Sequence, residues 1–222
     1  MIELFACNLK NTNDQEINYF TKFVSEQRKN HIAGYKRIGD VKRSLFGELL
    51  VRKIVIDHHD LSNDKITFDF NQYGKPSIFN LPGFHFSLSH SGDWVVCAAG
   101  EKAVGADIEE IRQVDFNIAE SFFSTEENHD LLSLPEDKRP KHFFRLWTLK
   151  ESFLKAQGTG LAGDLKAVKF RLQNKGIIAL QKDQVYYKTY HIDHGYCLAV
   201  CGYEKEFAPK IKMVNIKHSD FQ

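Results

Sequence analysis

The sequence predicts an α+β fold in which two similar α/β halves are related by a pseudo-twofold axis. The main observation is an internal similarity: residues 91–100 (SGDWVVCAAG) and 194–202 (HGYCLAVCG) each place a glycine turn and an aromatic residue before a small apolar strand. The two segments lie about half a chain length apart, and helix and strand patterns occur on both sides of residue 103. We therefore expect an N-terminal half at 1–103 and a C-terminal half at 104–222.

The N-terminal half is expected to begin with a strand at residues 2–8 and a helix that Asp14 caps. A longer helix starts at Asp40 and carries apolar residues at mostly helical spacing. Alternation predicts a strand at 66–70, and the cluster NQYGKP at 71–76 predicts a turn. Two further strands, at 85–89 and 94–99, form a hairpin around the turn 91–93.

The C-terminal half should open with a strand at 104–109, whose alternation places Gly105, Asp107 and Glu109 on one face. Residues 115–128 look helical, and 131–141 read as a charged linker. A long helix at 143–161 has an apolar arc wider than a surface helix needs, and Gly158 and Gly160 supply its end. Strands are then expected at 167–172, 177–180, 186–192 and 196–202.

The composition is that of an ordinary globular protein without a strong field of one sign. Hydrophobic residues make up 42% and charged residues 27% of the chain, and the net charge is +1. This balance argues against nucleic acid or membrane partners. Neither a signal-like start nor a long apolar run occurs, and the four cysteines lie in apolar segments without metal-binding spacing. We expect a cytoplasmic protein with reduced, buried cysteines.

Three charged residues of the helix at 143–161 are the first candidates for function. Lys150 projects from the apolar arc, where an unpaired ammonium is costly. It therefore either extends outward to water or pairs with a carboxylate such as Glu127. Glu151 and Lys155 stand four residues apart at the edge of the arc, and they form either an exposed ion pair or part of a site.

Asp107, Glu109 and Glu151 together suggest a cation site. If the helix lies against the strand, these carboxylates form an anionic cluster that raises its own pKa values unless a hard cation neutralises it. Mg²⁺ fits such a cluster, because it takes a few carboxylates and completes its shell with water and phosphate oxygens. Lys155, one turn beyond Glu151, would reach the same phosphates as a point charge.

Three motifs resemble, in order and spacing, the signatures of the 4′-phosphopantetheinyl transferases: FSLSHSGDWV at 86–95, VGADIE at 104–109 and FFRLWTLKESFLKAQGTGL at 143–161. The chain length and the YGKP turn at 73–76 resemble the surfactin-type group, which serves nonribosomal peptide and polyketide synthetases in antibiotic biosynthesis. The resemblance spans nearly the whole chain. It implies the fold of that family, an active site in the cleft between the halves, and a monomer that uses Mg²⁺ and coenzyme A.

The resemblance also implies a role for each matching residue. In the C-terminal half, Asp107, Glu109 and Glu151 would hold Mg²⁺. The phosphates would be contacted by Lys155, His90 and Ser89. The N-terminal half would bind the nucleotide of coenzyme A, with Tyr73, Gly74, Lys75 and Pro76 at the adenine and Arg43 at the 3′-phosphate. Two lysines that relatives use at this phosphate correspond here to Arg28 and His31.

The implied reaction moves 4′-phosphopantetheine from coenzyme A to a serine of an apo peptidyl or acyl carrier protein and releases 3′,5′-ADP. The expected catalytic residues are Glu151, Lys155, Glu127 and Lys150, and the base stays open among Glu151, Glu127 and a metal-bound water. Carrier docking is expected in the C-terminal half. Residues 111–123, which include Phe116 and Phe122, either offer an apolar surface to the carrier or bury these side chains in an amphipathic helix.

Other classes of protein are weighed against this reading. A serine hydrolase is disfavoured because no G-x-S-x-G elbow occurs, and a zinc hydrolase because no H-E-x-x-H occurs. Two alternatives stay open. One is a non-catalytic module of the same fold that binds coenzyme A or a carrier protein, and the other is a housekeeping modifier of fatty-acid carrier protein.

Overall fold

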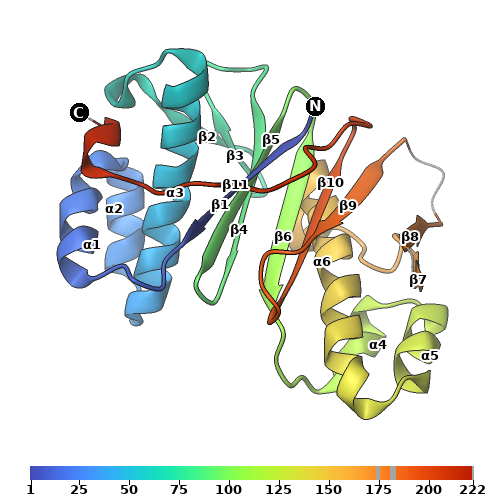
Figure 1. The fold of residues 1–222 in the computed structure, drawn as a ribbon. Coiled ribbons are helices and arrows are strands. Elements are labelled where there is room, and N and C mark those ends of the chain that lie inside the picture. Colours follow the sequence, from blue (N-terminus) through green and yellow to red (C-terminus); the bar gives the residue numbers. More distant parts are fainter. Residues whose placement is uncertain (174–175, 181–183, 222) are drawn as a thin grey trace.

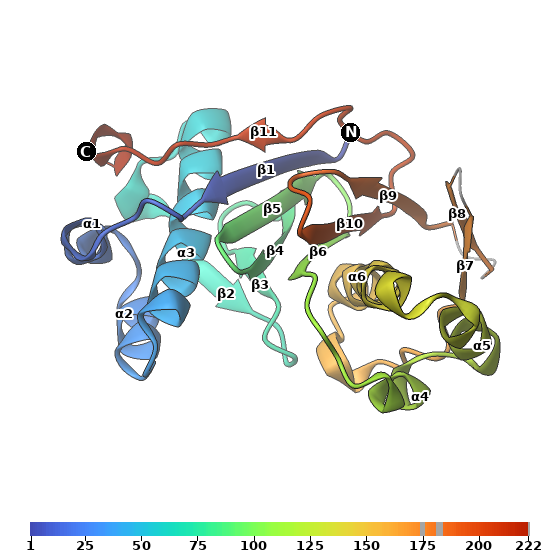
Figure 2. The same ribbon diagram turned by 60° about the horizontal axis from the view of Figure 1, so that its bottom comes forward.

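The protein is built from two sheets, each of which carries a long helix (Figure 1). The computed structural model describes residues 1–173, 176–180 and 184–221. Helix α3 (Ile38–His59) packs on a sheet of strand order β11-β1-β5-β4, and α6 (Arg139–Gln157) packs on a sheet of order β6-β10-β9. Figure 2 shows each helix beside its own sheet. The predicted α+β fold is therefore confirmed.

The first sheet is antiparallel except at its edge, where β11 runs parallel to β1. Its strands are β1 (Glu3–Asn8), β4 (His85–Ser91), β5 (Trp94–Gly100) and β11 (Lys212–Met213). Around it lie α1 (Asp14–Phe20), α2 (Glu26–Ala33) and the small hairpin of β2 (Phe68–Phe70) and β3 (Pro76–Ile78). The expected strands, turn and hairpin are all present.

Two helix starts in this half differ from expectation. Asn13, not Asp14, caps α1: its side chain accepts the Glu16 N–H at 3.0 Å, and the Glu16 carboxylate accepts the Asn13 N–H at 2.9 Å. This reciprocal capping box satisfies two backbone donors, whereas Asp14 lies in the first turn, where the helix dipole favours an acid. Helix α3 begins at Ile38, so Asp40 also lies inside its first turn.

The second sheet is antiparallel throughout. Its strands are β6 (Val104–Glu110), β9 (Tyr186–Tyr190) and β10 (Tyr196–Gly202). It is accompanied by α4 (Ala119–Phe122), α5 (Thr125–Ser133), α6 and a small hairpin of β7 (Phe170–Gln173) and β8 (Gly176–Ala179). The expected long helix is confirmed, although it starts earlier and ends at Gln157, where Gly158 adopts a left-handed φ of 75°.

The helix expected at 115–128 is interrupted, and this prediction is wrong. Helix α4 ends at Phe122, and Ser124 then caps the start of a new helix, α5. Its hydroxyl accepts the Glu127 N–H at 3.3 Å, and the Glu127 carboxylate accepts the Ser124 N–H at 2.8 Å. The sequence pattern S-x-x-E carried this signal. The linker expected at 131–141 is likewise partly helical, since α5 extends to Ser133 and α6 starts at Arg139.

The two segments with similar sequences occupy equivalent places in the fold. Strand β5 is the strand that pairs antiparallel with both β1 and β4, and β10 pairs in the same way with β6 and β9. The chain after β10 then returns to the first sheet (Figure 1), where β11 pairs with β1. There Phe221 packs against Phe20 and Phe23. The tail therefore lies with the N-terminal half, and the boundary near residue 103 stays a prediction.

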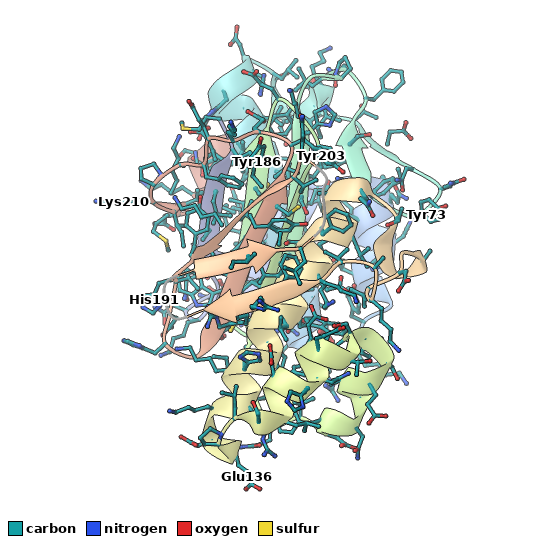
Figure 3. All side chains as sticks on the ribbon, turned by 90° about the vertical axis from the view of Figure 1, so that its right-hand side faces the viewer. Tyr73, Glu136, Tyr186, His191, Tyr203 and Lys210 are labelled. Carbon is teal, nitrogen blue, oxygen red and sulfur yellow. The ribbon has the colours of Figure 1, made fainter. Side chains whose placement is uncertain are left out.

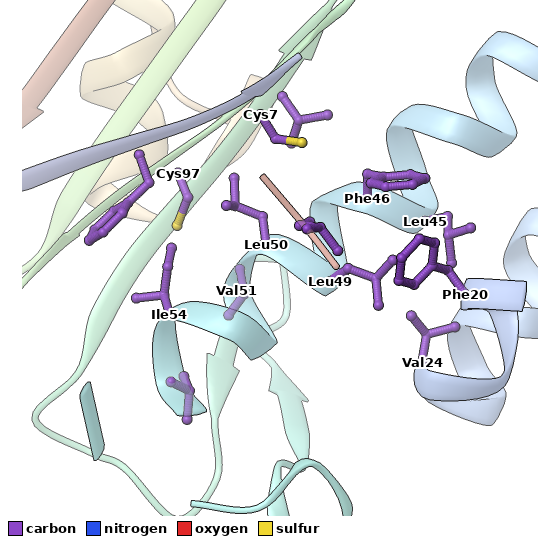
Figure 4. Close-up of a cluster of buried hydrophobic side chains, with 14 of the residues drawn as sticks. Cys7, Phe20, Val24, Leu45, Phe46, Leu49, Leu50, Val51, Ile54 and Cys97 are labelled. Carbon is purple, nitrogen blue, oxygen red and sulfur yellow. The ribbon is translucent and has the colours of Figure 1, made fainter. Parts of the chain in front are cut away.

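Three clusters of buried apolar side chains hold these layers together. One lies between α3 and the first sheet, where Cys7 and Cys97 face Leu50 and Ile54 (Figure 4). A second lies around α6, and a third joins strands β1 and β5 of the first sheet to β6 and β10 of the second. All four cysteines are buried and free, as expected. Because the third cluster contains residues of both sheets, the two halves share a core.

Candidate active site

Strand β6 presents two carboxylates on the face that α6 covers. Val104, Ala106 and Ile108 point into the shared core, so the predicted alternation is confirmed. On the other face, a Cβ at Gly105 would lie 1.8 Å from the Ser152 carbonyl oxygen of α6. Only glycine permits so close a contact of strand and helix. This approach brings the residues of α6 beside Asp107 and Glu109.

Helix α6 contributes Glu151 and Lys155 to this face. The Lys155 ammonium lies 2.6 Å from Asp107 Oδ1 and 2.9 Å from the hydroxyl of Ser89 on β4. Lys155 therefore pairs with Asp107 across the two elements, and the alternative of an exposed Glu151–Lys155 pair is wrong. Glu151 is itself buried beside them. Three elements from both halves thus meet at one group of charged side chains.

Two carboxylate oxygens of this group lack a hydrogen bond. Asp107 Oδ2 and Glu151 Oε1 are buried, and neither has a hydrogen-bond partner among the residues that the structure describes. Burial raises the pKa of Asp107, although its contact with Lys155 acts in the opposite direction. Burial, followed by the charge of Asp107, raises the pKa values of both Glu109 and Glu151. A cation placed among these oxygens would stabilise all three carboxylates.

The donor set fits Mg²⁺ bound together with phosphate. Within the described residues, no three acidic, histidine or cysteine side chains already close around one point as a complete metal cage. Mg²⁺ rarely needs such a cage, since it usually takes one or two carboxylates and fills its octahedron with water and phosphate oxygens. The two buried oxygens without partners are hard ligands of the required kind.

These residues line a cleft of about 550 Å³ between the two halves. Acidic side chains of the second half lie in one wall, and basic side chains of the first half lie in the other. The structure brings together most of the residues predicted from the sequence: Arg28, His31, Arg43, Gly74, Pro76, Ser89, His90, Asp107, Glu109, Glu151 and Lys155. Such a cleft suits a ligand rich in phosphate that arrives with a divalent cation.

A buried carboxylate that the sequence analysis missed organises the basic wall. Glu48 of α3 accepts the Arg28 Nε–H at 3.1 Å and the Ser25 N–H at 2.8 Å, and it pairs with Arg52 at 2.8 Å. The Arg28 guanidinium also donates to the Ser44 hydroxyl at 2.9 Å. Arg28 is thereby held in one orientation along the cleft. The i,i+4 spacing of Glu48 and Arg52 within an apolar helix was the available signal.

Two of the residues predicted at the adenine, Tyr73 and Lys75, do not line the cleft formed by the described residues. Tyr73 points outward at the edge of the molecule (Figure 3) and is half exposed. The Lys75 ammonium instead donates to three carbonyl oxygens, those of Val104, Lys155 and Ala156, at 3.1, 2.6 and 3.2 Å. With the bond from Asn71 to the Gly158 carbonyl, it fastens the 71–76 turn to the end of α6.

Glu127 and Lys150 form a separate buried pair at 2.8 Å. The Lys150 ammonium also donates to the carbonyls of Leu165 and Val168, and Glu127 accepts the Phe170 N–H. The sequence-based suggestion that these two residues are partners is confirmed, and the alternative that Lys150 reaches water is wrong. Neither residue lines the cleft in the part of the chain that the structure describes. The geometry thus favours a structural role over the predicted catalytic one.

The aromatic residues at 111–123 mainly pack inward. Phe116 contacts Phe143, and Phe122 contacts Trp147 with ring centroids 5.1 Å apart. These contacts favour the amphipathic alternative for most of this segment, while Ile118 keeps 40% of its surface exposed. None of the helices in the described part of the chain is long and apolar enough to cross a bilayer.

Comparison with known proteins identifies the family to which this two-lobed fold and its cleft belong. The model of the 4′-phosphopantetheinyl transferase superfamily matches residues 103–201, and the model of 4′-phosphopantetheinyl transferase, N-terminal, matches residues 11–102. The 4′-phosphopantetheinyl transferase Sfp of Bacillus subtilis (strain 168) is 36% identical over 205 residues, which cover 90% of this chain and 92% of that protein. The chain therefore belongs to the 4′-phosphopantetheinyl transferase superfamily.

Two further relatives among the curated proteins, psf-1 and gsp, agree with this assignment. The 4′-phosphopantetheinyl transferase psf-1 of Bacillus pumilus is 35% identical and aligns with 98% of this chain and 97% of its own. The 4′-phosphopantetheinyl transferase gsp of Aneurinibacillus migulanus is 40% identical and aligns with 72% of this chain and 68% of its own. The crystal structure of Thermotoga maritima holo-[acyl-carrier-protein] synthase matches 47% of this chain and 64% of that chain, with 27% identity and a TM-score of 0.39.

Proposed function

We propose that this protein transfers the 4′-phosphopantetheine group of coenzyme A to a serine hydroxyl of apo carrier proteins and releases 3′,5′-ADP. One observation carries the proposal: a single cleft joins three clustered carboxylates to a wall of basic side chains from the other half. Coenzyme A is a substrate with both a pyrophosphate and a separate 3′-phosphate. A site for it needs anion-binding groups at two places and a cation at the pyrophosphate.

Asp107, Glu109 and Glu151 would hold Mg²⁺ at the pyrophosphate. When bound there, the ion would neutralise the charge that builds on the pyrophosphate oxygens during transfer. Lys155 is placed to act on the same oxygens, since its ammonium lies at Asp107 and remains partly exposed to the cleft. Ser89 and His90 line the cleft beside it.

The basic wall of the first half would bind the 3′-phosphate. Arg28 is oriented by Glu48 and Ser44, and the Arg43 guanidinium is held by Asp40 and the Gly92 carbonyl. His31 lies in the same wall, with its Nε2 2.8 Å from the Tyr35 hydroxyl. We assign Gly74 and Pro76, which line the cleft, to the border of the adenine, and Lys75 to the contact with α6.

The attacking serine must lose a proton as the new phosphate ester forms. Of the two carboxylates considered as the base, Glu151 lines the cleft and Glu127 does not. In the described part of the chain, Glu151 also has a buried oxygen, Oε1, without a hydrogen-bond partner, and such an oxygen can accept a proton. We therefore propose Glu151 as the protein group that accepts the proton.

The finer parts of the proposal rest on the motifs of the surfactin-type group. We propose that the carriers are peptidyl or acyl carrier domains of nonribosomal peptide or polyketide synthetases, and that a cytoplasmic monomer performs the reaction. The shared core of the two halves supports the monomer, because one chain supplies both walls of the cleft.

The test is the intact mass of an apo peptidyl carrier protein after incubation with the protein, coenzyme A and Mg²⁺. We expect a gain of one phosphopantetheine that EDTA abolishes and that Asp107→Ala or Glu151→Ala prevents while the fold is retained. The same assay with a fatty-acid carrier protein compares the housekeeping alternative. If every carrier keeps its mass although coenzyme A binds, the protein is a non-catalytic binding module.

A further inference from the structure

Strands β4 and β6 lie side by side at the junction of the two halves, and serine hydroxyls connect them. Each strand is an edge strand of its own sheet. The Ser87, Ser89 and Ser91 hydroxyls of β4 accept the backbone N–H groups of Ala106, Ile108 and Glu110 of β6, at 3.0, 3.2 and 3.0 Å. Each serine thus reaches the residue nineteen positions later in the chain. We call this arrangement the serine seam.

Two of the three serines of the seam also donate a hydrogen bond to a carboxylate. A hydroxyl that accepts an N–H still has one proton to donate, and its direction is then restricted. The Ser89 hydroxyl donates to Asp107 Oδ1 at 2.9 Å, and the Ser91 hydroxyl donates to Glu109 Oε2 at 3.1 Å. Ser87 has no such carboxylate beside it, because the residue before its N–H partner Ala106 is Gly105, which has no side chain. The serines that face carboxylates therefore each hold one carboxylate oxygen.

We propose that Ser91 is a positioning residue that orients Glu109 toward the divalent cation. Its hydroxyl holds Oε2, so the carboxylate cannot rotate freely and its other oxygen is kept available to a ligand. Ser89 and Lys155 hold Asp107 in the same manner, and there the second oxygen, Oδ2, is buried and has no hydrogen-bond partner within the ranges that the structure describes. This inference rests on the proposed metal site and names a residue that sets its geometry.

The position of Ser91 supports this role over a purely structural one. Ser91 ends β4, just before the turn at Gly92, and that turn is held from two sides. The Gly92 carbonyl accepts a bond from Arg43 at 3.0 Å, and a Cβ at Gly92 would lie 2.1 Å from the Tyr196 hydroxyl. The serine is therefore fixed by its surroundings before any ligand binds. Hydrogen-bond partners of metal ligands typically change metal affinity by about 10- to 100-fold when removed.

The chain offers a matched control. Ser87→Ala removes an N–H acceptor from the same seam but no carboxylate contact, whereas Ser91→Ala removes both. Mn²⁺ binding, followed by electron paramagnetic resonance with coenzyme A present, measures cation affinity independently of transfer. We expect Ser91→Ala to lower the Mn²⁺ affinity by about tenfold relative to the unaltered protein. Ser87→Ala should keep the affinity within about twofold of the unaltered value. Ser91→Thr keeps the hydroxyl and should bind Mn²⁺ as the unaltered protein does.

A second comparison tests whether Ser91 acts through Glu109. In a Glu109→Gln background, Ser91→Ala should weaken Mn²⁺ binding no further. Three results would overturn the inference while leaving the metal site intact. They are a further loss of Mn²⁺ affinity by about tenfold in the Glu109→Gln background, equal losses of affinity in Ser87→Ala and Ser91→Ala, and no loss of affinity in Ser91→Ala. Absence of Mn²⁺ binding by the unaltered protein would instead overturn the metal site and the inference with it. If Ser91→Ala does not fold, Ser91→Cys, which is close in size and a weak donor, gives the same comparison.

Discussion

Lys150 and Glu127 form an ion pair in which the side chains are 0% and 2% exposed, and this pair lies outside the cleft that holds the other charged residues of α6. It joins α6 to the capping box of α5 and, through the carbonyls of Leu165 and Val168, to the loop before β7. Burial lowers the pKa of Lys150, and Glu127 acts in the opposite direction. A lysine next to the cleft residue Glu151 in the sequence thus serves the packing of the second half.

Lys150→Ala should reduce the free energy of unfolding by about 3–5 kcal/mol, because it leaves Glu127 buried without its counter-charge. Urea denaturation measures this loss. Lys141→Ala is the control, since Lys141 is an exposed lysine of the same helix and its replacement should stay within about 0.5 kcal/mol. An unchanged stability of Lys150→Ala would contradict the buried pair.

Gly105→Ala should destabilise the protein and reduce transfer together. The new Cβ would collide with the Ser152 carbonyl and with the Ala156 N–H group of α6, at 1.8 and 2.5 Å. Backbone atoms cannot rotate away, so α6 must shift and carry Glu151 and Lys155 from Asp107. Overpacking of this kind costs about 1–3 kcal/mol or more. Thermal unfolding and the carrier mass assay measure the two effects.

Gly83→Ala is the control for this change, because a Cβ at Gly83 meets nothing within 4 Å. It should melt at the temperature of the unaltered protein and keep its transfer rate. If Gly105→Ala behaves in the same way, the close approach of α6 and β6 is not required for the site.

Glu151→Gln should stabilise the metal-free protein although it removes activity. Burial and the charge of Asp107 raise the folded-state pKa of Glu151 above its unfolded value. Ionisation at neutral pH therefore costs the folded state free energy, and a neutral amide avoids this cost. The free energy of unfolding of Glu151→Gln should therefore be higher than that of the unaltered protein at neutral pH. Urea unfolding in EDTA measures the gain.

Two further observations complete this test. Glu126→Gln, at an exposed glutamate of α5, should not stabilise the protein. With coenzyme A present, Mg²⁺ should raise the melting temperature of the unaltered protein and leave that of Glu151→Gln unchanged. A less stable Glu151→Gln variant in EDTA would argue that the cluster is satisfied without a cation.

Lys75 should make the stability depend on pH in the alkaline range. Burial lowers the pKa of Lys75 from its ordinary 10.5 to about 8. Between these values the unfolded chain binds one more proton at this site than the folded chain, so folding stability rises as pH increases from 8 to 10.5. Lys75→Met and Lys75→Arg lack the titrating amine. The stability of the unaltered protein relative to either variant should therefore increase from pH 7.5 to pH 10, and a constant difference would contradict the lowered pKa.

Local patterns in the sequence accounted for most of the secondary structure and for the acidic part of the cleft, whereas the residues of the basic wall were expected from the family resemblance. Periodicity identified α6 and the alternation of β6, because the face of a side chain on a helix or strand depends only on its position in that element. The three carboxylates and Lys155 followed from these patterns once strand and helix were placed together. The capping boxes at Asn13 and Ser124 were equally local signals that were not used, and they explain the errors at 14 and 115–128.

Only the tertiary structure decided the partners of the long and buried polar side chains. Lys75 and Lys150 can reach carbonyl groups far away in the chain, and which carbonyls come within reach depends on how the elements pack. The same holds for Glu48 and for the serine seam, whose contacts join residues about twenty positions apart on different elements. The sequence by itself thus determined which faces of β6 and α6 carry the charged residues of the cleft, because that depends on local geometry. The fold decided which polar side chains are used in hydrogen bonds within the protein and which line the cleft with atoms left for a ligand. Buried polar groups in proteins are nearly always hydrogen-bonded, so packing sets this choice.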